Sequence, residues 1–347
     1  MSDMVNAILI EIDLQKNYLN QEIIHTIYFG GGTPSLVTAN DVHDIISAIR
    51  KHHSVAADVE ITLEANPDDF SSGKAMEFKG LGINRLSIGI QTWNNALLKL
   101  MNRAHDAAQA HGAIETVRES GFSNINLDLI YGIPGQTMDE LRNDLDQMTK
   151  NNPEHISTYS LTIESKTVFD HWKRKGKLIE PDEDQVAQQY RVIMESLIDA
   201  GYVHYEISNF AKPGFESKHN SSYWQGSKYL GIGPSAHSYD VVSRQHNIAN
   251  NYSYVKSINK KIVPFEREVL SMNDRINEYI FTTLRTHWGC DFREVQQKFN
   301  YDLSGPNRAY LHHLEKEKLA TFSDQVLKLT NQGKLLADKI TSDLFID

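Results

Sequence analysis

Five short runs of β-branched and apolar residues constrain the fold of this chain more than any other feature. They are Thr26–Phe29, Val59–Glu64, Arg85–Gln91, Ile125–Tyr131 and Ile156–Ile163. Successive runs begin 26 to 40 residues apart, which is enough for a strand–helix–strand unit of ~30 residues. Their composition suits parallel strands that are covered on at least one face. We therefore predict an α/β fold with five parallel strands that form a barrel or a partial barrel.

Other segments show helical periodicity or a change of pattern. Near the start, apolar residues at helical spacing predict a helix, with one face formed by Val5, Ile8, Leu9 and Ile12. After residue 165 we predict a helix over 183–200 with Ile198 on its apolar face, an irregular strand over 201–210, a long loop over 212–240 and a helix over 274–286. Helices and a hairpin between 291 and 347 resemble a small winged-helix-like α+β domain. The predicted domains are 1–210, 211–270 and 271–347.

Polar residues follow most of the predicted strands, where parallel α/β folds place their functional groups. The first strand leads into Gly30-Gly-Gly-Thr-Pro, the second into Glu64-Ala-Asn-Pro, and the third ends in Gln91-Thr92. The fourth carries Asp128 and leads into Gly132. A single Gly or Pro can simply turn the chain. Because several strand ends are polar together, we expect a small-molecule site at this rim.

Composition excludes several classes of protein. The 347 residues carry 45 acidic and 35 basic side chains, a formal net charge of −10, which does not suit a general nucleic-acid binder. No stretch reaches the ~18 apolar residues that span a bilayer, and residues 1–6 do not resemble a signal peptide. One cysteine, Cys290, cannot form an internal disulfide. We therefore expect a cytoplasmic protein without stable membrane insertion and without a nucleic-acid partner.

The rim motifs resemble the oxygen-independent coproporphyrinogen III oxidase-like family of the radical S-adenosylmethionine (SAM) enzymes. In chain order, the motifs are Tyr-Phe-Gly-Gly-Gly-Thr-Pro-Ser at 28–35, Leu-Glu-Ala-Asn-Pro at 63–67, Ser-Ile-Gly-Ile-Gln at 87–91, Asn-Arg-Ala-His at 102–105, Asp-Leu-Ile-Tyr-Gly-Ile-Pro-Gly-Gln-Thr at 128–137, His-Asn-Ser-Ser-Tyr-Trp at 219–224 and Gly-Ile-Gly-Pro-Ser-Ala-His-Ser at 231–238. The resemblance runs from residue 1 to about residue 340. It implies a partial (β/α)6 radical SAM barrel, here lacking its first strand, followed by a C-terminal domain.

The resemblance also assigns a SAM site. Its residues are Gly31, Gly32, Thr33, Glu64, Gln91, Arg103 and Asp128. Glycine lets the backbone approach the amino-acid end of SAM, and the Arg103 fork suits the SAM carboxylate. The alternative for Arg103 is a surface ion pair with Asp106, and for Asp128 it is a helix cap or an internal ion pair. We assign no catalytic residue.

The same resemblance makes His219 the candidate axial ligand of heme iron, with Tyr223 and Trp224 as flat contacts for a porphyrin. The alternative is that His219 caps or braces the loop and that both aromatic residues belong to the core. His237 is a weaker candidate of the same kind. His105, which we place on a helix beside Arg103, is expected to be structural. The remaining thiol, Cys290, is expected to act as a small buried hydrophobe.

One departure from the family pattern concerns the [4Fe–4S] cluster. Radical SAM proteins hold this cluster with a Cys-x-x-x-Cys-x-x-Cys motif after their first strand, and this sequence contains a single cysteine. A thiolate-ligated cluster needs three or four sulfur ligands, so this chain alone cannot hold it. We expect the chain to be an N-terminally shortened form. The alternatives are a natural remnant that binds heme or SAM without a cluster, and a fragment without function.

Three functions remain as hypotheses. The His-Asn-x-x-Tyr-Trp motif at 219–224 and the modest length resemble the heme-chaperone members of the family, which implies heme as cargo and heme-dependent respiratory membrane enzymes as acceptors. The second hypothesis is a coproporphyrinogen III dehydrogenase-like oxidoreductase that uses SAM and the cluster. The third is a cluster-free remnant that only binds SAM or heme.

Overall fold

The computed structural model describes residues 2–346 of the chain, which form two compact units. Unit 1 comprises residues up to 27, residues 37–60 and the chain from 218 onward, and unit 2 comprises residues 28–36 and 61–217. Strands β1 and β2 pass from one unit into the other. Each unit is described by itself.

A seven-stranded sheet is the main element, and it curls into a half-barrel. Its order is β1 (Ile24–Phe29), β2 (Val55–Ala65), β3 (Arg85–Gln91), β4 (Ile125–Tyr131), β5 (His155–Ser160), β7 (Asn209–Ala211) and β6 (Val203–Glu206). Strands β2 to β5 pair in parallel, and the hairpin β6–β7 joins β5 in antiparallel pairing. The predicted α/β class and the five strand positions are confirmed. The single irregular strand predicted over 201–210 is wrong, because a turn at residues 207 and 208 divides it into two strands.

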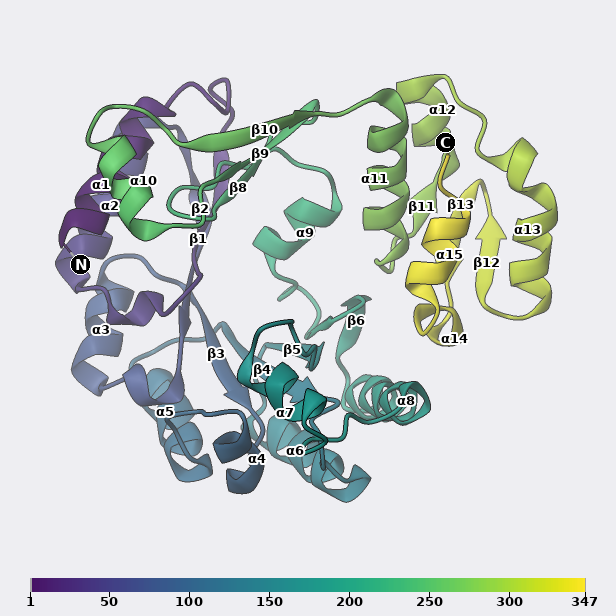
Figure 1. Ribbon diagram of the computed structural model, residues 1–347, viewed down its shortest axis with the longest axis horizontal. Coiled ribbons are helices and arrows are strands. Elements are labelled where there is room, and N and C mark those ends of the chain that lie inside the picture. The colour runs from purple at the N-terminus through teal and green to yellow at the C-terminus, as the bar shows by residue number, and fades with distance from the viewer. Residues whose placement is uncertain (1, 347) are drawn as a thin grey trace. The chain divides into compact units, whose positions relative to one another are not determined.

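Helices connect the strands as the spacing predicts (Figure 1). They are α2 (Ala39–His52), α3 (Ser72–Gly80), α4 (Asn95–Leu100), α5 (Ala107–Glu119), α6 (Met138–Asn151), α7 (Val168–Arg174) and α8 (Glu183–Asp199), with one-turn helices at Pro34–Leu36 and Pro67–Asp69. Capping boxes at Asp106, Thr137 and Asp182 fix where α5, α6 and α8 begin. On α8 the expected face is buried except for Ile198, which is 39% exposed.

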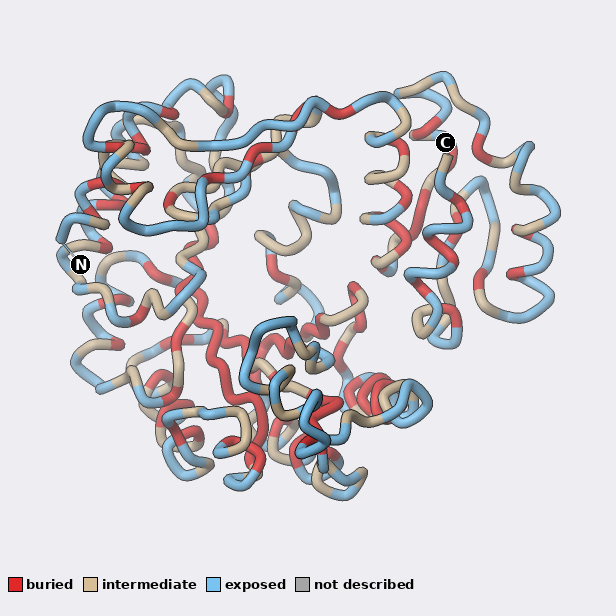
Figure 2. Tube along the Cα trace, in the orientation of Figure 1, coloured by how far each residue is buried: buried red, intermediate tan, exposed pale blue. Residues whose placement is uncertain are grey.

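The two faces of the sheet differ in chemistry. One face carries apolar side chains such as Leu63, Leu86 and Leu127, which have no exposed surface, and α6 and α8 pack against β4. On the other face, one row of register partners is polar across four strands and contains Glu64, Ser87, Asn126 and His155. Figure 2 shows how deeply this part of the sheet is buried. Since parallel strands are usually apolar on both faces, a polar row indicates a functional face.

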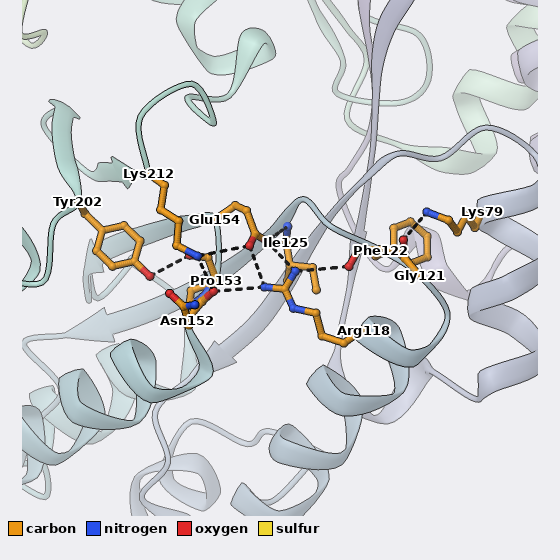
Figure 3. A network of polar contacts seen from close by, with 10 residues as sticks. All are labelled: Lys79, Arg118, Gly121, Phe122, Ile125, Asn152, Pro153, Glu154, Tyr202 and Lys212. Carbon is orange, nitrogen blue, oxygen red and sulfur yellow. Dashed lines mark hydrogen bonds and ion pairs between the residues drawn. The ribbon is translucent and has the colours of Figure 1, made fainter.

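Ion pairs brace the N-terminal ends of the central strands, as Figure 3 shows. Glu154 precedes β5 and is 9% exposed. Its carboxylate accepts a hydrogen bond from the Ile125 N–H at 3.1 Å and pairs with Arg118 at 2.8 Å and Lys212 at 3.4 Å. Close by, the Tyr202 hydroxyl donates to the Pro153 carbonyl at 2.8 Å. These contacts fix the start of β4 and β5 and thereby the polar row above them.

Unit 1 contains more regular structure between residues 218 and 270 than the sequence predicts. The segment includes α9 (Lys218–Trp224), β8 (His237–Tyr239), β9 (Ser243–Asn247), α10 (Asn251–Ile258) and β10 (Phe265–Val269), and the three strands form a second sheet. The long loop predicted over 212–240 is therefore wrong. The N-terminal helix α1 (Ser2–Leu14) is confirmed, and it packs against α10 in this unit.

The C-terminal part of unit 1 has the helix–hairpin–helix order that the sequence predicts. Its elements are α11 (Met272–Leu284), β11 (Cys290–Asp291), α12 (Phe292–Phe299), α13 (Ser304–Lys316), β12 (Ala320–Ser323), β13 (Val326–Leu329), α14 (Asn331–Lys334) and α15 (Ala337–Asp343). The strands pair in the order β11, β13, β12 around an apolar core. Among residues 2–346, no helix combines the length and apolarity needed to cross a bilayer.

Candidate functional site

The glycine loop after β1 is tied to β2 through Glu64. The Glu64 carboxylate accepts hydrogen bonds from the Tyr28 hydroxyl at 2.7 Å and from the Gly31 N–H at 3.0 Å. Gly31 and Gly32 have φ angles of +79° and +67°, and a side chain on either would meet no atom within 4 Å. Gly30 is packed instead, because a Cβ there would lie 2.5 Å from the Tyr28 ring. The loop thus presents open backbone beside a fixed carboxylate.

Asp128 lies on the polar face of β4, two residues beyond Asn126. Its Oδ1 accepts a hydrogen bond from the Asn126 amide at 2.7 Å. Burial raises the pKa of Asp128 to about 6, the Asn126 hydrogen bond opposes that rise, and the negative charge of Glu64 adds to it. The expected alternatives for Asp128, a helix cap or an internal ion pair, are absent among the described residues. Two carboxylates near each other on one face suit a ligand with cationic and hydroxyl groups.

Arg103 and His105 lie in the loop between α4 and α5, so the helix predicted for them is wrong. Asp106 caps α5 by accepting from the Gln109 N–H at 2.9 Å, and Arg103 makes no ion pair with it in the part of the chain that the structure describes. Burial lowers the pKa of Arg103, and Asp128 opposes that lowering. His105 is 4% exposed and bonds to the Ile90 carbonyl at 3.1 Å, which agrees with a structural role.

Gln91 ends β3 with a left-handed backbone, at φ +69°. A side chain other than glycine is uncommon in that region and often marks a functional site. The register between β3 and β4 shifts between Ile88 and Gln91. Asp144 of α6 holds the next two residues, because its carboxylate accepts from the Thr92 hydroxyl at 2.7 Å and from the Trp93 N–H at 2.8 Å. Asp144 therefore fixes the turn that presents Gln91.

We expect Asp144→Asn to change the pH dependence of stability. Burial raises the pKa of Asp144 from its ordinary value of 3.8 to about 6. The contribution of Asp144 to the stability of the wild type is therefore lost as the pH rises from the ordinary pKa through the raised one. The variant lacks this loss. Between pH 4 and 7.5 the stability difference should move in favour of the variant by up to about 3 kcal/mol. Thermal midpoints of both proteins across this range test it, and parallel pH profiles would contradict it.

Unit 2 holds all seven residues predicted for the SAM site. Gly31 and Glu64 are joined by a hydrogen bond, and Glu64 and Arg103 are both close enough to Asp128 for their charges to act on it. Thr33 accepts from the Leu36 N–H through its carbonyl at 3.1 Å. The sequence reasoning missed the polar partners Tyr28, Arg85, Ser87, Asn126, His155 and Tyr205. Alternation of polar and apolar residues in 85–88 and 126–129 was the signal that could have identified the polar face.

His219 lies on α9 in unit 1 and is held from two sides. Its Nδ1 lies 3.0 Å from the Thr26 hydroxyl of β1. Its backbone N–H donates to Glu60 at 3.0 Å, and the Lys218 N–H donates to the same carboxylate at 3.2 Å. Glu60 is 7% exposed. The Glu60 carboxylate thus accepts from the first N–H groups of α9. It fixes the N-terminal end of this short helix, which carries the His219 imidazole.

Aromatic rings continue from His219 along unit 1. The His219 ring lies 4.9 Å from Tyr223, edge to face, and Tyr223 lies 4.6 Å from Tyr229 in the same manner. Tyr229 is followed by Tyr239 at 6.0 Å. Tyr223 is 38% exposed. Within the described residues, the buried indole N–H of Trp224 has no hydrogen-bond partner. The motif therefore combines a held imidazole, an exposed ring and an unsatisfied donor.

The residues present do not fit a [4Fe–4S] cluster. Cys290, the only cysteine, has no exposed surface and lies in the C-terminal core. Burial raises the pKa of its thiol to about 12, so it does not supply a thiolate. Across residues 2–346, no group of three His, Cys, Asp or Glu side chains is arranged to hold a metal. We therefore derive no step through the cluster.

Comparison with known proteins defines the class. The radical SAM superfamily model matches residues 10–148, and the HemN C-terminal domain model matches residues 270–336. Coproporphyrinogen III oxidase (HemN) from Escherichia coli has the same fold, with a TM-score of 0.84 at 21% identity over 99% of this chain and 83% of that one. The fold and the rim geometry thus define a radical SAM protein with a HemN-type C-terminal domain.

Curated relatives define the family more narrowly. Heme chaperone HemW from Lactococcus lactis is 37% identical over 94% of this chain and 86% of its own length, and that from Bacillus subtilis is 35% identical over 95% and 90%. HemW from Mycobacterium tuberculosis is 31% identical over 97% and 85%. The chain belongs to the HemW family.

Proposed function

We propose that this protein is a heme chaperone, which binds heme through α9 and passes it to heme-dependent respiratory membrane enzymes. The observation that carries the proposal is His219, held by Thr26 and followed by the aromatic rings of the same unit. Relatives that are named as heme chaperones, at 31–37% identity over nearly the whole chain, support it.

The contacts of His219 suit an iron ligand. A ligating imidazole usually uses its second nitrogen to bond a neighbouring group, which fixes the orientation of the ring. Here Thr26 contacts Nδ1, so the iron bond would form through Nε2. Tyr223 offers a partly exposed ring for the flat apolar face of a porphyrin. The buried Trp224 N–H offers a donor to a carboxylate arm.

SAM is the second ligand we propose, on the polar face of unit 2. It carries a carboxylate, an amino group, a sulfonium cation and ribose hydroxyls. The Gly31–Gly32 backbone and Glu64 would hold the amino-acid end, and the Arg103 fork would pair with the carboxylate. Gln91 and Asp128 would hold the ribose. The open space above Gly31 and Gly32, together with the Glu64 carboxylate, fits the amino-acid end of SAM.

Heme transfer tests the chaperone proposal. The protein is loaded with one equivalent of heme and mixed with membranes from heme-depleted bacterial cells, and oxidase activity is followed with time. We expect activity to return faster than with free heme or heme-loaded serum albumin at the same concentration. Equal rates for all three donors, or heme that stays on the protein, would contradict the proposal.

A further inference from the structure

A chain of hydrogen bonds crosses the polar face of the sheet in unit 2 and ends at Asp128. The Tyr205 hydroxyl of β6 lies 2.7 Å from Nε2 of His155 at the start of β5. Nδ1 of His155 lies 2.6 Å from Oδ1 of Asn126 on β4. The Asn126 amide nitrogen lies 2.7 Å from both Oδ1 of Asp128 and the Ser87 hydroxyl on β3. Tyr205, His155 and Asn126 are at most 2% exposed.

The direction of each hydrogen bond follows from the Asp128 carboxylate, at which the hydrogen-bond chain ends. The Asp128 carboxylate only accepts, so the Asn126 amide nitrogen donates to it and Oδ1 of Asn126 faces His155. Oδ1 also only accepts, so Nδ1 of His155 carries the proton and Nε2 accepts from Tyr205. Burial holds the pKa of His155 well below its usual range, which keeps the ring neutral with one N–H. Oδ1 of Asn126 accepts a second hydrogen bond from the Ser157 hydroxyl at 3.1 Å.

We propose that His155 and Tyr205 are positioning residues for Asp128, acting through the orientation of the Asn126 amide. The proposal rests on the proposed role of Asp128 in SAM binding. Without the Tyr205 hydroxyl, Nε2 of His155 loses its hydrogen-bond partner and the imidazole loses the contact that fixes its orientation. Nδ1 then holds Oδ1 of Asn126 less firmly, and an amide that turns over brings this oxygen against the Asp128 carboxylate. An oxygen against a carboxylate disfavours its charged form.

Other charged and polar groups also act on Asp128 and must stay constant in a test. Glu64 of β2 raises the pKa of Asp128, whereas Arg85 of β3 and Ser157 of β5 lower it. Arg103 in the α4–α5 loop and Tyr159 of β5 interact with its charge as well. The Tyr205 hydroxyl bonds to Nε2 of His155 at 2.7 Å, so its removal acts on the hydrogen-bond chain at the end far from Asp128.

Two tyrosines of the same region provide the test and its matched control. Tyr205→Phe removes the donor to His155, and His155→Gln removes the ring itself. Tyr202→Phe removes a buried hydroxyl that bonds to the Pro153 carbonyl and does not belong to the hydrogen-bond chain. Two quantities are measured for each variant: the Asp128 pKa, by NMR titration of ¹³C-labelled aspartate carboxyls assigned with Asp128→Asn, and SAM affinity at pH 7, by calorimetry.

We expect Tyr205→Phe and His155→Gln to raise the pKa of Asp128 by ~0.5 or more and to weaken SAM binding about 2- to 10-fold. Tyr202→Phe should change neither. If Tyr205→Phe and His155→Gln leave the pKa of Asp128 where it is in the wild type, the positioning proposal is wrong. If both raise it while Asp128→Asn leaves SAM affinity unchanged, the positioning stands and the proposed SAM role of Asp128 fails. If the wild type binds no SAM, the titration alone decides the positioning.

Discussion

Glu11→Gln is expected to lower the free energy of unfolding of unit 1 by about 1–3 kcal/mol. Glu11 has no exposed surface, and four donors converge on its carboxylate. Gln15 and Asn247 donate to Oε1, each at 2.7 Å, while the Gly233 N–H at 2.8 Å and the Tyr254 hydroxyl donate to Oε2. A glutamine side chain keeps one acceptor and turns its own N–H₂ toward two of these groups. If they are Tyr254 and Gly233, the Tyr254 hydroxyl can accept from the amide, but the Gly233 N–H stays buried without an acceptor.

Those four contacts connect α1 with β9, α10 and the Gly231–Ser238 motif, so the loss should spread through this part of unit 1. Glu22→Gln is the matched control, since Glu22 is 51% exposed and pairs with Lys228 at the surface. We expect the control to cost less than ~1 kcal/mol. Thermal unfolding and hydrogen exchange at α1 and β9 measure both variants. Equal protection of α1 and β9 in the two variants would show that Glu11 does not hold these elements together.

Strand–helix alternation made the central fold predictable. The five runs lie where β1 to β5 lie, because parallel strands need apolar residues on the face that the helices cover. The long loop predicted over 212–240 was wrong, and the strands between 237 and 269 went unpredicted, for a physical reason. Strands β8 to β10 are three to five residues long, and β10 is exposed throughout, so they carry little hydrophobic periodicity. Helix α9 begins where Glu60, far away in sequence, caps it.

The candidate site was predictable only in part. Motif order proposed Glu64, Asp128 and His219 as site residues, and the structure shows what holds them. Asp128 accepts from Asn126, two residues away on the same strand, which the polar–apolar alternation over 126–129 marks. His219 contacts Thr26, a residue 193 positions away, and such a contact arises from tertiary packing and leaves no mark in local sequence. Glu11 shows the same limit, since helical periodicity predicts α1 without indicating that a carboxylate is buried on it.

His219→Ala is expected to have the largest effect on function. Removal of the imidazole removes the proposed axial ligand, while Glu60 still accepts from the backbone N–H groups of Lys218 and His219, so α9 should keep its start. Stacking on Tyr223 remains, so the variant should still bind heme weakly through apolar contact. We expect heme affinity to fall at least ~10-fold, because loss of ~1.4 kcal/mol or more accompanies loss of the iron bond. His246→Ala is the matched control, as His246 lies on β9 of the same unit and is half exposed.

Titration of heme into the wild type, His219→Ala and His246→Ala, followed through the Soret band, tests the central claim most directly. The account predicts that wild type and His246→Ala give the same shifted Soret maximum and the same affinity. It predicts that His219→Ala gives the spectrum of heme without this ligand and the weaker affinity. An unchanged Soret maximum and affinity in His219→Ala would contradict the assignment of His219 as the heme ligand.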